Sequence, residues 1–197
     1  MDLEFLGAFK EDWKPVSKPA LIAWLVFFGL FLLHALTSKS GFLIIDYVFL
    51  PIHESGHLLF GYFGSMIGTW GGTLMQLLVP FALTVYFAYE RHTAGTAFCA
   101  FFFFENFLNI SVYMADARRQ ELQLVTVGSG EDVMHDLFVI FSSLGVLERD
   151  TTIAAIVRVV GWVGMLAAVG WLIYRARSSK PPTPLPPWLR RPAQRHT

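Results

Sequence analysis

The 197-residue sequence has few charged side chains: Asp, Glu, Lys and Arg make up 15% of it, whereas 54% of its residues are hydrophobic. A soluble domain usually carries about a quarter charged residues. The mean hydropathy of +0.50 points the same way, and several nearly uncharged runs approach the roughly 20 residues that a membrane helix needs. The sequence therefore predicts a multi-pass integral membrane protein.

The sequence also has only one cysteine, no net charge and no signal-peptide pattern, and each of these limits the classes of protein to which it can belong. The single cysteine, Cys99, excludes an intramolecular disulfide and is expected to be a buried structural thiol. The formal net charge is zero, so no overall basic field suggests a nucleic acid as partner. The N-terminus lacks the basic start and cleavage site of a signal peptide, so we expect the first apolar run to be retained. No internal repeat or second soluble domain is evident.

The apolar runs predict an all-α bundle of about six transmembrane helices. We expect helices over about 20–36, 42–63, 73–89, 94–114 and 153–174, and a short apolar segment over 134–147. If that segment does not cross the bilayer, five helices remain. Residues 1–19 form a polar, interfacial arm, 20–176 one transmembrane domain, and 177–197 a tail rich in proline and arginine. The glycine-rich stretch 65–72 is expected to form a tight or re-entrant loop.

The distribution of positive charge predicts the orientation. Arg175, Arg177 and further basic residues follow the last predicted helix, so the positive-inside rule places the C-terminus in the cytoplasm. With six crossings, the N-terminus and the loop carrying Arg118 and Arg119 are cytoplasmic too; with five, they are outside. The distribution of positive charge favours the arrangement with six crossings. We expect the protein in the inner membrane of a bacterium.

The sequence Pro51-Ile-His-Glu-Ser-Gly-His57 places three ionisable residues inside an otherwise apolar run. Such residues at membrane depth are costly and usually functional. On a helix, His53 and His57 lie on one face, about 6 Å apart along the axis, so that two imidazoles can share a metal ion. Glu54 points to the side, where it can act as a base on water. This is the HExxH arrangement of zinc-dependent hydrolases.

A catalytic zinc site needs a third protein ligand, and the motif does not supply it. Asp116 ends the polar stripe of the fourth predicted helix, and His135 begins the next apolar segment. We expect one of these two to be the third ligand, with Glu105 as a weaker candidate. Asp46 is about 10 Å from His53 along a helix, too far to share the ion, and is expected to support the site or pair helices.

Further polar residues are expected to surround the site. Glu105, Asn109 and Asp116 are spaced by four and seven, so they share one stripe of a helix that should face the bundle interior. These side chains can orient the imidazoles, hydrogen-bond a substrate or stabilise an oxyanion, and they can equally serve only to join helices. The residues expected in such roles are Gln76, Glu105, Asn106, Asn109 and Asp136.

With HESGH in a membrane helix, a glycine-rich stretch after it and an aspartate ending a later helix, the chain resembles the site-2 protease family of intramembrane zinc metalloproteases. The resemblance covers about residues 42–116. It implies that His53, His57 and a later aspartate bind one zinc ion and that Glu54 activates water. The family's aspartate stands before glycine, whereas Asp116 stands before alanine, and no PDZ insertion is recognisable. The implied substrate is a membrane-spanning or membrane-proximal peptide.

The sequence therefore predicts a membrane-embedded zinc metallopeptidase with Zn²⁺ as its cofactor. Two alternatives stay open at this point. One is a membrane metalloenzyme that acts on something other than a peptide, such as a lipid-linked substrate. The other is a non-catalytic membrane protein that binds a metal or a partner helix.

Overall fold

The computed structural model describes residues 12–38, 40–122 and 135–178, so the outer parts of the predicted N-terminal arm and C-terminal tail lie outside the described residues. Within these ranges the chain is helical, without a strand. The helices are α2 (Lys18–Thr37), α3 (Asp46–Gly61), α4 (Ser65–Tyr89), α5 (Thr93–Asp116), α6 (Asp136–Ser143), the 3₁₀ turn η1 (Leu147–Arg149) and α7 (Asp150–Ser178).

Six α-helices are described, but only four of them have the length and hydropathy to cross a membrane. These are α2, α4, α5 and α7 together with its preceding 3₁₀ turn. The 16 residues of α3 rise about 24 Å and the eight residues of α6 about 12 Å, less than the roughly 30 Å hydrocarbon core. The all-α class is confirmed for the described residues, with four helices that could cross a membrane. Neither six nor five crossings is confirmed, because α3, within the predicted helix 42–63, and α6 are both too short to span.

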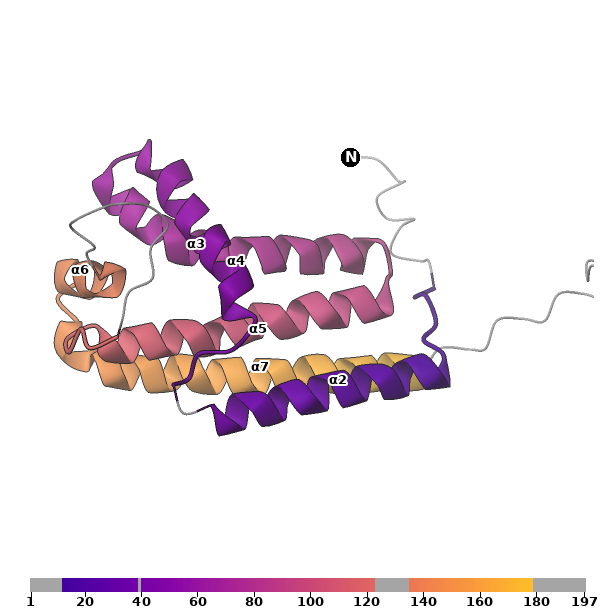
Figure 1. Ribbon diagram of the computed structural model, residues 1–197. Helices are drawn as coiled ribbons and strands as arrows, with labels where there is room; N and C mark the ends of the chain where they lie inside the picture. The colour runs from indigo at the N-terminus through magenta and orange to yellow at the C-terminus, as the bar shows by residue number, and fades with distance from the viewer. Residues whose placement is uncertain (1–11, 39, 123–134, 179–197) are drawn as a thin grey trace, which may run out of the picture.

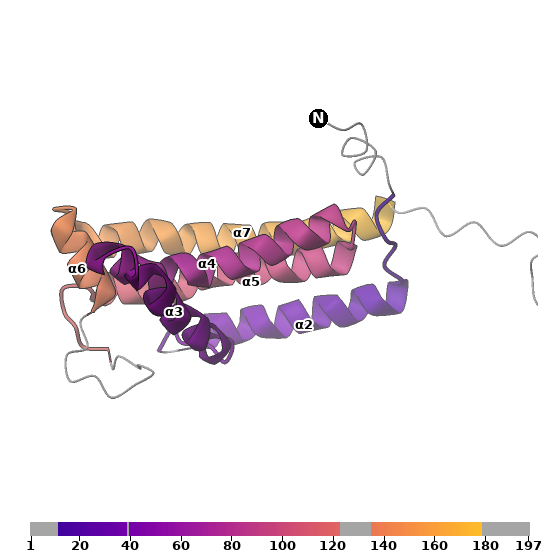
Figure 2. The ribbon, with the colours of Figure 1, turned by 90° about the horizontal axis from the view of Figure 1, so that it is seen from above.

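The four long helices run side by side, and α3 and α6 lie together at one end of the bundle (Figures 1 and 2). The central helix is α5, which packs against both α7 and α4. The start of α2, the α4–α5 turn and the end of α7 lie at the opposite end (Figure 1). This arrangement puts Arg118 and Arg175 at opposite ends of the bundle, whereas the six-crossing version puts them on one side.

Helices α3 and α4 form a hairpin held together by glycines. The hairpin turns at Gly64, whose φ of 117° favours glycine. A methyl group added to Gly56 would overlap the carbonyl of Gly71, and one added to Gly68 would lie 2.9 Å from the Cα of Gly61. Small residues on both helices thus let α3 and α4 approach closely. The expected loop over 65–72 is wrong: these residues form the first turns of α4, because their glycines pack against α3.

The polar stripe of α5 faces the bundle interior, as expected. Glu105, Asn106, Asn109 and Asp116 are all buried. On another side of α5, Phe104 lies so close to Gly164 of α7 that a side chain there would overlap the ring. α5 is thereby fixed between α4 and α7, with its polar residues directed toward α3 and α4.

Candidate metal centre

The two histidines of the HESGH sequence lie next to each other on α3. Their Nε2 atoms are 3.1 Å apart, and the ring centroids are 4.8 Å apart in an edge-to-face arrangement. This follows from their spacing of four residues, which places side chains on one helical face. The predicted pairing of His53 and His57 is therefore present in the structure.

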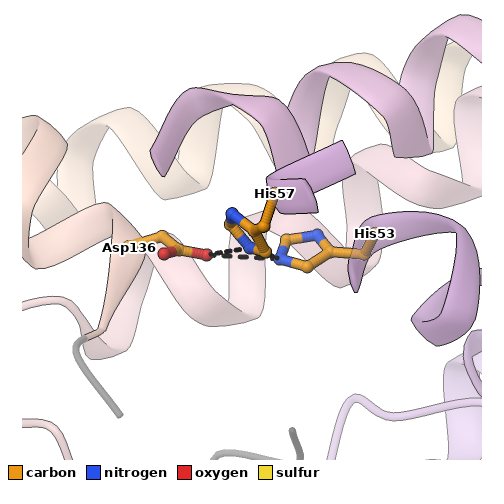
Figure 3. Close-up of side chains that lie close together, drawn as sticks. All are labelled: His53, His57 and Asp136. Atoms are coloured by element: carbon orange, nitrogen blue, oxygen red, sulfur yellow. Dashed lines mark hydrogen bonds and ion pairs between the residues drawn. The ribbon is translucent and has the colours of Figure 1, made fainter. Parts of the chain in front are cut away.

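A carboxylate from a distant segment completes the group. Asp136 is the first residue of α6, and its Oδ2 atom lies 3.2 Å from Nε2 of His53 and 3.0 Å from Nε2 of His57 (Figure 3). The N-terminus of a helix favours a negative side chain at this position. His53, His57 and Asp136 are thus three metal-ligating side chains whose ligand atoms lie within 4.8 Å of one another.

The hydrogen bonds on the far side of each imidazole decide which nitrogen carries the proton. Nδ1 of His53 lies 3.0 Å from Oε1 of Gln76, and Nδ1 of His57 lies 2.8 Å from the carbonyl oxygen of Gly68. Both partners are carbonyl oxygens, which only accept, so each Nδ1 must donate. In a neutral ring the Nε2 lone pair is then free. Two such nitrogens and one carboxylate oxygen then lie 3.0–3.2 Å from one another.

The dimensions of this group match a tetrahedral metal ion. Ligands at about 2.0–2.1 Å in tetrahedral geometry are about 3.3 Å apart, and the three distances here are 3.0–3.2 Å. Gly72 of α4 borders the same point: a methyl group added to it would lie 2.5 Å from both Nε2 atoms. Only glycine at this position leaves the space beside the two nitrogens open.

The charge and exposure of the group suit a metal ion that reacts with an outside molecule. The three side chains are 22–26% exposed, so the centre is partly sheltered and still accessible. Burial raises the pKa of the Asp136 carboxyl, but its contacts with His53 and His57 outweigh burial and bring the pKa below its ordinary value. The carboxyl is therefore ionised at neutral pH, and its charge favours a cation between the rings.

The structure brings Asp136, and neither Asp116 nor His135, next to the two histidines. The carboxylate of Asp116 accepts hydrogen bonds from the backbone N–H groups of Glu121 and Leu122, at 3.0 and 3.1 Å. It is thus committed to the turn that ends α5. Asp136, expected in a supporting role, is the carboxylate that lies beside His53 and His57 and could complete a metal site with them.

His135 is turned away from the two other histidines. Its Nδ1 atom accepts the N–H of Phe138 and caps α6, so its Nε2 carries the proton, 3.6 Å from Asp116 Oδ2. Burial lowers the pKa of His135, which keeps the ring neutral. Asp116 and His135 thus lie close together where the end of α5 meets the start of α6. Both residues therefore support the placement of Asp136.

The other predicted polar residues fall into two groups. Gln76 donates from Nε2 to Oδ1 of Asn109 at 3.0 Å, so both are connected to His53. Glu105 is fully buried beside Asp46 and does not reach the histidines as a ligand. Asn106 donates to the carbonyl of Phe102 on its own helix, at 2.7 Å, and takes no part in the centre.

Glu54 and a tyrosine that sequence reasoning missed lie near the centre. Glu54 is half-buried on α3 and close enough to His57 for their charges to interact. Tyr113 of α5 is half-buried and lies within electrostatic range of both Glu54 and Asp136. Its position four residues after Asn109 places it on the polar stripe, which is the signal that could have identified it.

Comparisons with protein-family models, with curated proteins and with solved structures found no match to this chain. The resemblance to site-2 proteases therefore stays a prediction.

Proposed function

We propose that this protein is a membrane-embedded zinc metallopeptidase that hydrolyses peptide bonds of membrane-associated substrates. The observation that supports the proposal most directly is the close grouping of two Nε2 atoms and one carboxylate oxygen near Glu54. Three protein ligands leave a fourth position open, as catalytic zinc sites require. The site-2 protease resemblance supports the same reading, with Asp136 in place of the aspartate first expected.

Each residue would have a distinct role. His53 and His57 would hold the zinc ion through Nε2, and Asp136 through a carboxylate oxygen. When bound, zinc lowers the pKa of a water molecule toward neutrality and polarises a carbonyl group. Glu54 takes the proton of the attacking water and passes it to the leaving amine. Tyr113 is the candidate hydrogen-bond donor to the carbonyl oxygen as negative charge develops on it.

The charges of the described residues support an orientation for the site. Lys14, Lys18, Arg91, Arg175 and Arg177 lie at the end of the bundle with the start of α2 and the end of α7. The end that carries α3 and α6 has four such residues, Arg118, Arg119, Arg149 and Arg158, of which Arg158 donates to Ser111 inside the bundle. By the positive-inside rule, the first end is cytoplasmic. In a bacterial inner membrane, the substrate bond would then lie toward the outer face.

The test is zinc content and peptide hydrolysis of the purified, lipid-reconstituted protein. We expect about one zinc per chain, and cleavage of transmembrane peptides that stops in Glu54→Gln while the zinc stays bound. Loss of one general base typically costs about 10²–10⁴-fold in rate. Glu90→Gln, the same exchange at the opposite end of the bundle, is the matched control and should cleave normally.

Several outcomes would contradict the proposal. Protein purified without chelators and lacking zinc would exclude it. Two histidines and one carboxylate are also the ligand set of iron(II) oxygenases, so stoichiometric iron would redirect the assignment to redox chemistry. A Glu54→Gln variant as active as the wild type would exclude hydrolysis through this residue. Bound zinc without cleavage of any peptide, in turn, would favour a non-peptide substrate or a binding role.

A further inference from the structure

A chain of buried amides leads away from the metal centre into the bundle. His53 donates from Nδ1 to Gln76, and Gln76 donates from Nε2 to Asn109, at 3.0 Å each. Gln76 and Asn109 are 4% and 5% exposed, so water does not compete for these groups. An amide presents an oxygen on one side and NH₂ on the other. The direction of one hydrogen bond therefore fixes the direction of the next.

The hydrogen bonds that link His53, Gln76 and Asn109 can run in either of two directions, with opposite consequences for His53. In one, Gln76 turns its oxygen to Nδ1 and leaves Nε2 free for a metal. In the other, both amides are reversed, Gln76 donates to Nδ1, and the proton moves to Nε2, where it blocks coordination. A group at the far end of the chain must select one direction.

Asp46 occupies that far end. It is 2% exposed at the start of α3 and lies within electrostatic range of the Asn109 side chain, without a hydrogen bond between them in the structure. Its Oδ2 atom accepts the backbone N–H of Leu43 at 2.6 Å, which holds the carboxylate in place. The negative charge of an ionised carboxylate attracts the NH₂ end of a neighbouring amide, so Asn109 turns its NH₂ toward Asp46 and its oxygen toward Gln76.

Glu105 explains how Asp46 keeps this accepting role in the bundle interior. Glu105 is fully buried beside Asp46, and neither of its carboxyl oxygens has a hydrogen-bond partner among the described residues. Oδ1 of Asp46 has none either. Two adjacent buried carboxylates cannot both be ionised, so one proton is shared between them. With the proton on one Glu105 oxygen and directed at Oδ1 of Asp46, two of these three oxygens gain a hydrogen-bond partner and Asp46 stays the acceptor.

We propose that Asp46 is a positioning residue for the metal centre: through Asn109 and Gln76 it holds His53 in the tautomer whose Nε2 is free to bind a metal ion. The inference rests on the proposed function for the identity of the metal. The tautomer itself is a property of the metal-free protein. Asp46 touches neither substrate nor metal, and it acts from three side chains away.

The test compares Asp46→Asn with Glu105→Gln. Both exchange a buried acid for its amide, at neighbouring positions of the same cluster. In Asp46→Asn, the Leu43 N–H retains the amide oxygen, so an uncharged NH₂ replaces the negatively charged Oδ1 and the hydrogen bonds along Asn109 and Gln76 reverse their direction. In Glu105→Gln, the new NH₂ can still donate to Asp46, and the direction is kept. Two quantities are measured: zinc affinity by chelator competition, and the ring tautomer of His53 by ¹⁵N NMR of metal-free, histidine-labelled protein.

We expect Asp46→Asn to weaken zinc binding about 10–100-fold, the usual cost of losing support behind a metal ligand, and to move the His53 proton to Nε2. Glu105→Gln should keep the wild-type tautomer and affinity. The double variant Asp46→Asn with Asn109→Asp moves the acceptor one step along the chain and should restore both properties. A merely structural role for Asp46 would not be rescued by this exchange.

Three results would overturn the inference. The first is Nε2 protonation of His53 in the metal-free wild type, a measurement that needs no variant to fold. The second is wild-type tautomer and zinc affinity in folded Asp46→Asn. The third is loss of affinity in the double variant while its fold is intact by circular dichroism. If instead the wild type binds no zinc, the proposed function fails, and the tautomer measurement still decides the role of Asp46.

Discussion

Gly72 offers the sharpest test that the space beside the two imidazoles is a metal site. In Gly72→Ala the new methyl carbon would lie 2.5 Å from the Nε2 atoms of His53 and His57. Ordinary van der Waals contact begins at 3.4 Å. Each nitrogen must therefore retreat by about 0.9 Å, whereas metal–ligand distances tolerate about 0.2 Å.

The rings have little freedom to make that movement. Their Nδ1 atoms are held by Gln76 and by the Gly68 carbonyl, at 3.0 and 2.8 Å. Displacing both ligands should cost at least the roughly 100-fold in metal affinity at the upper end of supporting-shell mutations. Helix α4 itself should persist, because alanine has a higher helix propensity than glycine.

The assay is zinc affinity by chelator competition, with circular dichroism to verify the fold. Gly170→Ala is the matched control: Gly170 also lies in a long helix, and a methyl group there would meet nothing within 4 Å. We expect the control to bind zinc as the wild type does. Wild-type affinity in folded Gly72→Ala would refute the geometry argued for this centre.

Three further predictions address the ligand, its support and the hairpin. Asp136→Asn should abolish stoichiometric zinc binding in metal analysis. Asp116→Asn should retain zinc and lower the free energy of unfolding by about 1–3 kcal/mol, because its contacts with backbone N–H groups are lost. Loss of zinc only in Asp116→Asn would make Asp116, and not Asp136, the third ligand. Gln76→Leu removes the acceptor for an imidazole N–H and should weaken zinc binding about 10–100-fold in chelator competition, and an unchanged affinity would count against that support. Gly56→Ala places a methyl group against the Gly71 carbonyl and should destabilise the fold by about 1–3 kcal/mol in denaturant titration, so unchanged stability would contradict the close packing of α3 on α4.

Long apolar runs were the most informative part of the sequence for the fold. The four helices with enough length and hydropathy to cross a membrane begin and end within a few residues of four predicted ones, except that α4 starts at Ser65. The glycines at its start have low helix propensity, and only their packing against α3 explains why they are helical there. Such a tertiary contact cannot be read from local composition.

The metal centre was predictable where the spacing within one helix determines it. His53 and His57 were placed by helical periodicity alone. The third ligand depends on how the chain returns to α3 after the end of α5, and local spacing carries no information about that path. His135 and Asp136 are neighbours at the start of α6, and the capping hydrogen bond of His135 to Phe138 determines which of them faces the histidines. The sequence motif alone could not distinguish them.

The position of Asp136 also has a consequence for how the protein is made. It follows His53 by 83 residues in the chain, so at about 5–20 residues per second the ribosome adds it about 4–17 seconds later. During that interval the growing chain offers an ion only two imidazoles. The centre is assembled only after α5 has been inserted and α6 has returned to α3. Metal binding by the proposed centre would then be a late event of biogenesis, possible only in a correctly assembled bundle.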